Sequence, residues 1–402
     1  MILKSITREV KNNKAVLSAE ISYNQNTETQ TLFFSYPEEY FDYLPQNADP
    51  FFPALLIPAM EMKEDLEIVP PISAKIIQNQ PIIQDVFATW HPEKFSKINI
   101  IANNQTEIKA ETQIIRNATF FSLGVDSMYS MLKYLPWQNP AKEKALTSLI
   151  YMKGLELPLS VYIKGQDKEV IDSVKKLAEH YKLEAIVGET NIRDIFPLDW
   201  EDYYFGPGLA ATALSLSQGF RNVYIPSSHS YATLFPDPSS PLLDSLWSNE
   251  NTFLFHDGSE RERVQKITDM IVHDPFALKN LRVCVSNEGG NYNCGKCWKC
   301  IRTMITLEII DKLHDCGSFP NQLPKNYSMQ LRTYIIDSLE FTKENLRLAR
   351  KHGKKDIERI LEREIRVGKL DLMRNGKPIS YLVKEMAHYL YVKTARRMGF
   401  FS

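Results

Sequence analysis

Four cysteines of this 402-residue chain lie close together in the sequence: Cys284, Cys294, Cys297 and Cys300. Two residues separate Cys294 from Cys297 and Cys297 from Cys300, which places three sulfurs on one tight turn. Thiolates are soft, strong metal ligands, and four of them suit a tetrahedral zinc ion. Because such a site has no open position, the zinc is predicted to be structural rather than catalytic. An iron–sulfur cluster, which uses the same ligands, is the alternative.

A second segment suited to chemistry is a short turn of mostly small residues. It consists of Ser122, Leu123, Gly124, Val125, Asp126 and Ser127, between an apolar stretch and a helical pattern. Such a turn leaves backbone N–H groups unpaired at the start of the helix, and with the helix dipole they attract phosphate. Gly124 lets a phosphate approach the backbone, and the hydroxyls of Ser122 and Ser127 can donate to it. Asp126 repels a bare phosphate, so it either caps the helix or helps to hold the magnesium that accompanies ATP.

The elements that position this turn are predicted between residues 113 and 316. Strand patterns alternate there with helical ones: the strands are Ala118–Phe121, Leu149–Met152, Ala185–Val187 and Val223–Pro226, and the helices Asp126–Leu135, Lys168–Tyr181 and Gly208–Ser217. This alternation predicts an α/β domain whose parallel sheet is covered on both faces. Such sheets bind ligands beyond the carboxyl ends of their strands, where the strand order reverses.

A serine- and histidine-containing segment is expected at the same edge of the sheet. Ser227, Ser228 and His229 follow the last of these strand patterns, and we predict that they contact the substrate. His229 either transfers a proton or makes only a local hydrogen bond.

Two regions flank this core. Residues 1–112 are predicted to form a β-rich α+β domain of unknown role, from patterns at Ala15–Tyr23, Thr29–Tyr36, Asp49–Met60, Ser73–Trp90 and Ile98–Ala102. Residues 317–402 are predicted to be helical, and Ser338–Val367 is interrupted only by Gly353. From Phe341 to Ser402 there are sixteen Lys or Arg and seven Asp or Glu residues, a net charge of +9 in a chain of net charge −1. This basic region is either a solvated helical surface or a contact for RNA or an acidic partner.

The composition is that of a soluble globular protein, with 44% hydrophobic and 24% charged residues. No apolar run approaches the length of about 20 residues that a membrane helix needs. The first residues lack the apolar core of a signal peptide, and clustered cysteines fit a metal site in a reducing compartment. A cytoplasmic protein without membrane contact is therefore expected. Cys316 fits no metal-binding spacing and is predicted to be an ordinary buried thiol.

The turn from Ser122 to Ser127 resembles the SGGxDS signature of the PP-loop ATP pyrophosphatases, with Leu123 in the place of the first glycine. Together with the four cysteines about 160 residues later and with Arg302, it resembles 7-cyano-7-deazaguanine synthase over about residues 117–304. Those synthases are shorter and lack both flanking regions. Their tyrosine-proline-aspartate-cysteine-arginine stretch is replaced here by Ile225–Tyr231, which suggests a diverged relative with a different substrate.

The resemblance implies a HUP-type PP-loop core that binds ATP and Mg, with a structural zinc. A carboxylate or amide oxygen of a small-molecule or peptide substrate would attack the α-phosphate, releasing pyrophosphate. Ammonia or an amine would then displace AMP, making the protein a C–N ligase. The family's phosphate-binding lysine is best matched by Lys266, for which a solvated lysine is the alternative. Lys266, Arg302 and Asp126 with its magnesium are expected to offset the charge that builds up on the phosphates.

Two other functions remain open. The basic C-terminal region suggests a PP-loop enzyme that modifies RNA, because clustered cations attract phosphates. Alternatively, the loop has decayed at Leu123, and the protein is a nucleotide-binding or partner-binding scaffold. The nitrogen source and the presence of a homo-oligomer are also open.

Overall fold

The computed structural model describes residues 1–23, 26–107, 116–138, 142–162, 167–285, 292–331, 333 and 335–373. Its internal contacts divide the chain into two compact units. The first comprises Met1–Ser122 and Asp126–Glu260, and the second comprises Leu123–Val125 and Arg261–Ser402. The boundaries of these units differ from those of the predicted regions 1–112, 113–316 and 317–402. The division into those three domains stays a prediction.

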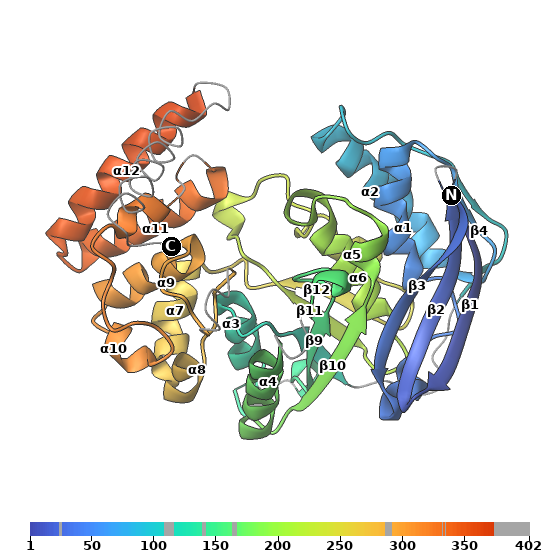
Figure 1. The fold of residues 1–402 in the computed structure, drawn as a ribbon, viewed down its shortest axis with the longest axis horizontal. Helices are drawn as coiled ribbons and strands as arrows, with labels where there is room; N and C mark the ends of the chain where they lie inside the picture. Colours follow the sequence, from blue (N-terminus) through green and yellow to red (C-terminus); the bar gives the residue numbers. More distant parts are fainter. Residues whose placement is uncertain are drawn as a thin grey trace, which may run out of the picture. The chain divides into compact units, whose positions relative to one another are not determined.

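The first unit is built on a ten-stranded sheet of order β12-β11-β8-β9-β10-β3-β2-β1-β4-β6 (Figure 1). The strands are β1 (Ile2–Lys11), β2 (Lys14–Tyr23), β3 (Asn26–Pro37), β4 (Leu66–Ile68), β6 (Ile100–Ala102), β8 (Asn117–Phe120), β9 (Ser148–Lys153), β10 (Glu184–Thr190), β11 (Asn222–Pro226) and β12 (Phe253–Asp257). Strands β8 to β12 are parallel to one another. The short strands β5 (Ile72–Ser73) and β7 (Gln105–Thr106) pair separately. The predicted α/β class with a mostly parallel central sheet is confirmed.

The N-terminal strands extend this sheet rather than forming a sheet of their own. Strands β1, β2 and β3 form an antiparallel meander, and β3 pairs antiparallel with β10. In β2, Ala15, Leu17, Ala19 and Ile21 are all buried, as expected for period-2 alternation. Asn12 and Asn13 join β1 to β2 with φ of 52° and 60°, the backbone that a two-residue hairpin turn requires. The sequence pattern predicted β2 and β3 but not β1.

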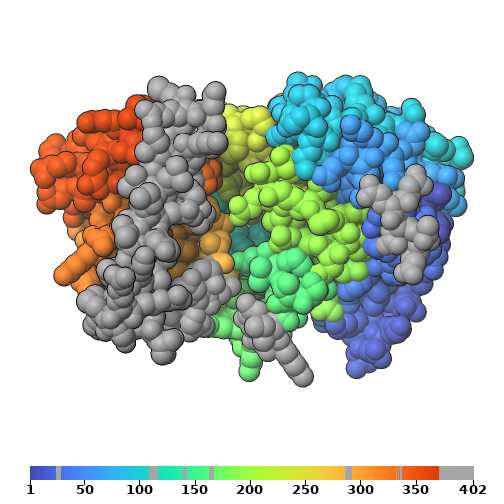
Figure 2. Space-filling model, turned by 45° about the horizontal axis from the view of Figure 1, so that its top comes forward, coloured from blue at the N-terminus to red at the C-terminus, as the bar shows by residue number. Residues whose placement is uncertain are grey.

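Helices cover both faces of the sheet. Those of the first unit are α1 (Phe51–Met62), α2 (Ala74–Trp90), α3 (Val125–Lys133, of which Val125 belongs to the second unit), α4 (Lys168–His180), α5 (Ile192–Ile195) and α6 (Phe205–Leu214). Helices α1 and α6 pack on one another and share a core with Ile150 and Ile186, whereas α4 packs against β9 and β10. In the space-filling view, the light-blue segment of α1 and α2 adjoins the green segment of α5 and α6 (Figure 2). The sheet is thus enclosed by helices near its parallel strands.

The second unit is helical in its described part. Its helices are α7 (Arg263–Asp269), α8 (Pro275–Lys279), α9 (Trp298–Ile309), α10 (Leu313–Cys316), α11 (Ile336–Lys351) and α12 (Lys355–Met373). Ile301, Ile305 and Ile309 of α9 share a core with Leu346 and Leu361. Gly353, with φ of 67°, lies between α11 and α12, at the predicted interruption.

The charges of α11 and α12 are largely paired within the second unit. Arg350 binds Glu358 and Glu362, and Lys354 binds Asp311. Residues 374–402, which carry much of the predicted basic surface, lie outside the described residues. No helix in the described part of the chain is both long and apolar enough to cross a membrane.

Candidate functional site

The strand order reverses between β8 and β11. From β8 the chain proceeds outward through β9 and β10, and then returns to the other side of β8 with β11 and β12. Open α/β sheets bind ligands in the crevice at such a reversal, beyond the carboxyl ends of the strands. The two segments that leave this point are the turn that begins at Ser122, after β8, and the segment that begins at Ser227, after β11.

A hydrogen bond joins these two segments. The Ser228 hydroxyl donates to Oδ2 of Asp126 at 3.4 Å. Within the turn, the Ser122 N–H donates to Oγ of Ser127 at 3.3 Å, and the two hydroxyl oxygens lie 3.5 Å apart. Ser122 is exposed and Ser127 is buried. Both segments therefore present hydroxyl groups to the same edge of the sheet.

Leu123 has the backbone conformation of a glycine. Its φ is 68°, in the left-handed region that side chains other than glycine rarely adopt. Holding a non-glycine residue there costs about 1–2 kcal/mol. Its side chain is fully buried, and its carbonyl accepts a hydrogen bond of 3.0 Å from the N–H of Arg282 in the same unit. The turn thus keeps a glycine-like path while a packed leucine holds it in place.

Helix α3, which follows the turn, is held by an acidic clamp at the end of β12. Asp257 accepts hydrogen bonds from Ser130 (2.5 Å), Lys133 (2.7 Å) and Tyr134 (2.9 Å). Lys133 also donates to Glu260 at 2.7 Å. Burial lowers the pKa of Lys133, but the charge of Asp257 and these hydrogen bonds outweigh it and hold the pKa above its ordinary value. The sequence had indicated no role for Asp257 in positioning this helix.

The predicted substrate residues line a pocket in the first unit. Ser227, Ser228 and His229 contribute to it, together with His256 from β12. The empty space is about 350 Å³, including the part open to solvent. Oγ of Ser227 donates to the carbonyl of His229 at 2.7 Å, and the His229 ring meets the edge of Phe235 with 4.6 Å between ring centres. The structure therefore brings all three residues to one concave surface.

A histidine–aspartate pair in this pocket was missed from the sequence. Nδ1 of His256 lies 2.7 Å from Oδ2 of Asp244, at the start of the 3₁₀ helix η6 (Asp244–Trp247). The Ser239 hydroxyl donates to the same carboxylate oxygen at 2.8 Å. Asp244 is fully buried, and burial raises its pKa despite the opposing hydrogen bond and charge of His256. Asp244 lies in an irregular segment without a periodic pattern, so no sequence signal linked it to His256.

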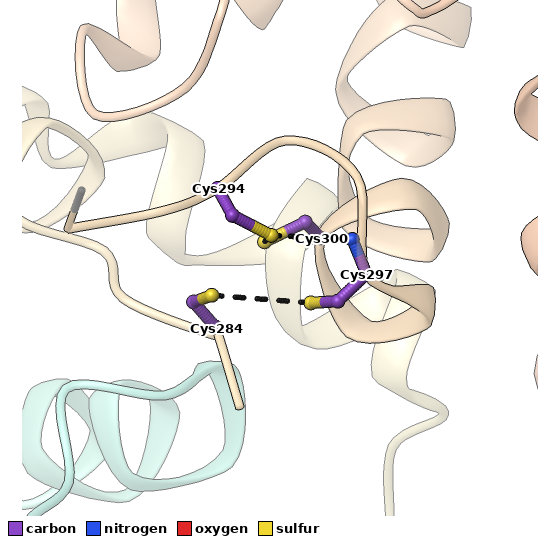
Figure 3. Close-up of side chains that lie close together, drawn as sticks. All are labelled: Cys284, Cys294, Cys297 and Cys300. Atoms are coloured by element: carbon purple, nitrogen blue, oxygen red, sulfur yellow. Dashed lines mark hydrogen bonds between the residues drawn. The ribbon is translucent and has the colours of Figure 1, made fainter. Parts of the chain in front are cut away.

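The four clustered cysteines form a metal-binding group in the second unit. Cys284, Cys294, Cys297 and Cys300 have sulfurs that all lie within 4.8 Å of one another. The Cys294–Cys300 and Cys284–Cys297 sulfur distances are 3.9 and 4.0 Å (Figure 3). Sulfurs placed about 2.3 Å from a tetrahedral zinc ion are about 3.8 Å apart, so the donor set fits zinc. The predicted cysteine cluster is therefore confirmed as a group that can hold a metal ion.

Contacts among these thiols shift their pKa values in opposite directions. Hydrogen bonding from Cys300 lowers the pKa of Cys297 to about 4, and the same contact raises the pKa of Cys300. Gly295 has φ of 66°, and a Cβ there would lie 2.5 Å from Cγ of Pro320, so the turn requires glycine. Cys316 is buried apart from this group, and its thiol donates to the carbonyl of Leu278 at 3.1 Å. It is the ordinary buried thiol that was predicted.

Lys266 and Arg302 are buried in the second unit. Lys266, on α7, is 0% exposed, so it is not the solvated lysine that was the alternative. The Arg302 guanidinium, on α9, lies 4.0 Å from the ring centre of Phe341 and 4.7 Å from that of Trp298. Complete burial of a lysine is rare, which marks Lys266 as more than a surface residue. The expected contact of both residues with phosphate stays a prediction.

Comparison with known proteins gives no further assignment, because this chain matches no family model, no curated protein and no solved structure.

Proposed function

We propose that this protein is an ATP-dependent C–N ligase that releases pyrophosphate and AMP. One observation carries the proposal: the turn from Ser122 to Ser127 leaves β8 beside the strand-order reversal and runs into α3. The left-handed backbone at Leu123 supports it, because strained backbone of this kind clusters at ligand-binding sites. The amides at the start of α3 would receive the phosphates of ATP.

The proposed reaction has two steps. An oxygen of a carboxylate or amide substrate attacks the α-phosphorus of ATP, the bond to the bridging oxygen breaks, and pyrophosphate leaves. Asp126 would hold the magnesium that neutralises the phosphates, since carboxylates are the ligands that Mg²⁺ prefers. Ammonia or an amine then attacks the activated carbon and displaces AMP. Lys266 and Arg302 are the proposed cationic groups that stabilise the leaving pyrophosphate.

The metal has a supporting role in this proposal. Cys297 immediately precedes α9 and Cys300 lies in its first turn, so a zinc ion bound by the four sulfurs would fix the start of that helix. Arg302 lies two residues after Cys300 on the same helix. With four sulfur ligands the zinc would have no position for a substrate, and its contribution is to the fold.

The test is the identity of the products formed from ATP. The protein is incubated with ATP, MgCl₂ and pools of carboxylic acids, with hydroxylamine as a nucleophile that traps activated acyl groups. Equal amounts of pyrophosphate and AMP, formed only when an acid is present, would support the ligase. Formation of ADP and phosphate would contradict it. Binding of ATP without any turnover across the pools would favour the scaffold.

The RNA-modifying alternative has less support in the described residues. The basic side chains Arg350, Lys354 and Arg363 are each bonded to an acidic side chain. Paired charges on a helical surface attract phosphates less than free ones. We therefore favour a small carboxylate substrate.

A further inference from the structure

The pocket at the end of β11 and β12 is lined by both polar and apolar side chains. Its polar lining includes Ser227, Ser228, His229, Asp237, Ser239 and His256, and Phe205, Leu234 and Phe235 form an apolar wall. The described lining includes one acidic side chain and neither lysine nor arginine. A second carboxylate, that of Asp244, lies directly behind His256. This lining favours a cation over an anion.

The histidine–aspartate pair supplies a base in the same place. The His256 side chain is 7% exposed, and the Asp244 side chain is 0% exposed. With Nδ1 held by Asp244, Nε2 is the ring nitrogen left for a molecule in the pocket. A carboxylate bonded to one ring nitrogen fixes the tautomer and stabilises the imidazolium that forms when the other nitrogen takes a proton. No described residue hydrogen-bonds Oδ1 of Asp244, so the carboxylate keeps capacity to stabilise that charge.

We infer that this pocket binds the nitrogen nucleophile as an ammonium ion bearing a short carbon chain, and that His256 removes its proton. The hydroxyls of Ser228 and Ser239, each of which donates to a carboxylate, and the carboxylate of Asp237 would accept the N–H groups, while the apolar wall would contact the carbon chain. The role as a base rests on the proposed function, whereas the binding of an ammonium ion does not. The nucleophile is then a primary amine rather than ammonia.

The second step requires that the amine lose a proton before it attacks. A primary amine at neutral pH is mostly R–NH₃⁺, which has no lone pair for attack. One proton passes to Nε2 of His256, and the freed lone pair forms the C–N bond at the carbon activated by AMP. The C–O bond from that carbon to AMP breaks, and AMP leaves with the electron pair. The nitrogen then loses a second proton to water.

The binding experiment uses butylammonium chloride, with sodium butyrate as the anionic probe of the same chain length. We expect butylammonium to shift the imidazole ¹⁵N signals of His256 and butyrate to leave them unchanged. The Asp237→Asn variant should weaken butylammonium binding by about tenfold, because it removes the charge that faces the ammonium. Asp172→Asn, an exposed acid on α4, is the matched control and should change binding by less than about twofold. Tighter binding of butyrate, or no response of His256 to butylammonium, would overturn the inference.

The reaction experiment separates the base from the rest of the site. With an acid that supports pyrophosphate release, His256→Gln should keep ATP–pyrophosphate exchange and lose about 100-fold in transfer to butylamine. Transfer to hydroxylamine, which is already neutral at pH 7, should fall far less. His180→Gln, an exposed histidine on α4, is the control and should match the wild type with both nucleophiles. Equal losses with butylamine and hydroxylamine would refute a role as a base. The thermal unfolding of His256→Gln, and of His256→Asn as a second variant, would show whether a loss of activity comes from a loss of folding.

The two experiments fail in different ways. If no acid supports pyrophosphate release while butylammonium still binds beside His256, the ligase and the base role are both refuted and the ammonium site stands. If pyrophosphate is released but butylammonium does not bind, the ligase stands and the pocket has been assigned wrongly.

Discussion

The Ser228 hydroxyl and the Asp126 carboxylate are hydrogen-bonded at 3.4 Å across the reversal of strand order between β8 and β11. This bond joins the segment proposed to hold phosphates to the segment that lines the pocket of His256. Because Asp126 is the proposed magnesium ligand, Ser228 would orient that ligand rather than bind the metal. Substitution of Asp126 should therefore lower the rate of pyrophosphate release more than substitution of Ser228.

Asp126→Asn should lower the rate of pyrophosphate release by at least about 100-fold, since it removes the negative charge that binds magnesium. Ser228→Ala should lower it by less than about tenfold, because it removes only one hydrogen bond to a partly exposed carboxylate. Initial rates at several MgCl₂ concentrations would check this. A magnesium requirement unchanged in Asp126→Asn would contradict the assigned role.

Substitutions of Leu123 should rank in an unusual order. Both Leu123→Ala and Leu123→Gly lose a buried side chain, at about 2–5 kcal/mol. Glycine is ordinarily less stable than alanine, but here it relieves a left-handed backbone that costs alanine about 1 kcal/mol. We therefore expect Leu123→Gly to be the more stable variant by up to about 1 kcal/mol in urea unfolding. If Leu123→Ala is the more stable, the backbone at this position is not strained.

The cysteine group should hold one zinc ion per chain, measured by elemental analysis of the purified protein. Cys297→Ser should lose the zinc and lower the unfolding temperature, because the metal stabilises the fold that binds it. Cys316→Ser is the matched control, since Cys316 is a buried thiol outside the group, and it should keep the zinc. Visible absorption from bound iron would instead indicate an iron–sulfur cluster.

Glu344 on α11 should make stability depend on pH. Burial raises its pKa from 4.5 to about 7, although it accepts a hydrogen bond from the N–H of Val264. Because the folded carboxyl has the higher pKa, folding takes up a proton between about pH 4.5 and 7, and stability falls as the pH rises through that window.

Glu344→Gln removes this dependence while keeping an oxygen for Val264. The unfolding free energy of the variant minus that of the wild type should rise by about 1–3 kcal/mol when the pH is raised from 5 to 8. Denaturant unfolding at both pH values measures the difference. An equal effect of the substitution at pH 5 and pH 8 would show that Glu344 has an ordinary pKa.

Local patterns in the sequence predicted the parts of the fold that depend on neighbouring residues. The alternation of strands and helices from Ala118 onward, and the interruption at Gly353, are visible within windows of a few residues. The spacing of the cysteines likewise limits the geometry of their sulfurs. These features were predictable because the physics that fixes them is short-range.

Features that depend on distant segments were missed. The pairing of β3 with β10 joins Ser35 to Glu189, and nothing in either strand specifies the partner. The pairing of His256 with Asp244 depends on the path of an irregular segment. The burial of Lys266 contradicts the ordinary preference of lysine for solvent, so no composition rule would have predicted it.

The junction of β3 with β10 has a consequence for any shortened form of the protein. At this junction, Glu189 and Thr190 pair with Ser35 and Phe34, and the Asn191 side chain bonds the backbone of Thr31 and Phe33. A chain that began near residue 113 would lack β3 and leave the edge of β10 open to solvent. Exposed strand edges recruit other chains. Such a fragment should self-associate through β10. In the full chain, the N-terminal strands pair with β10 and so prevent the parallel sheets of different molecules from joining edge to edge.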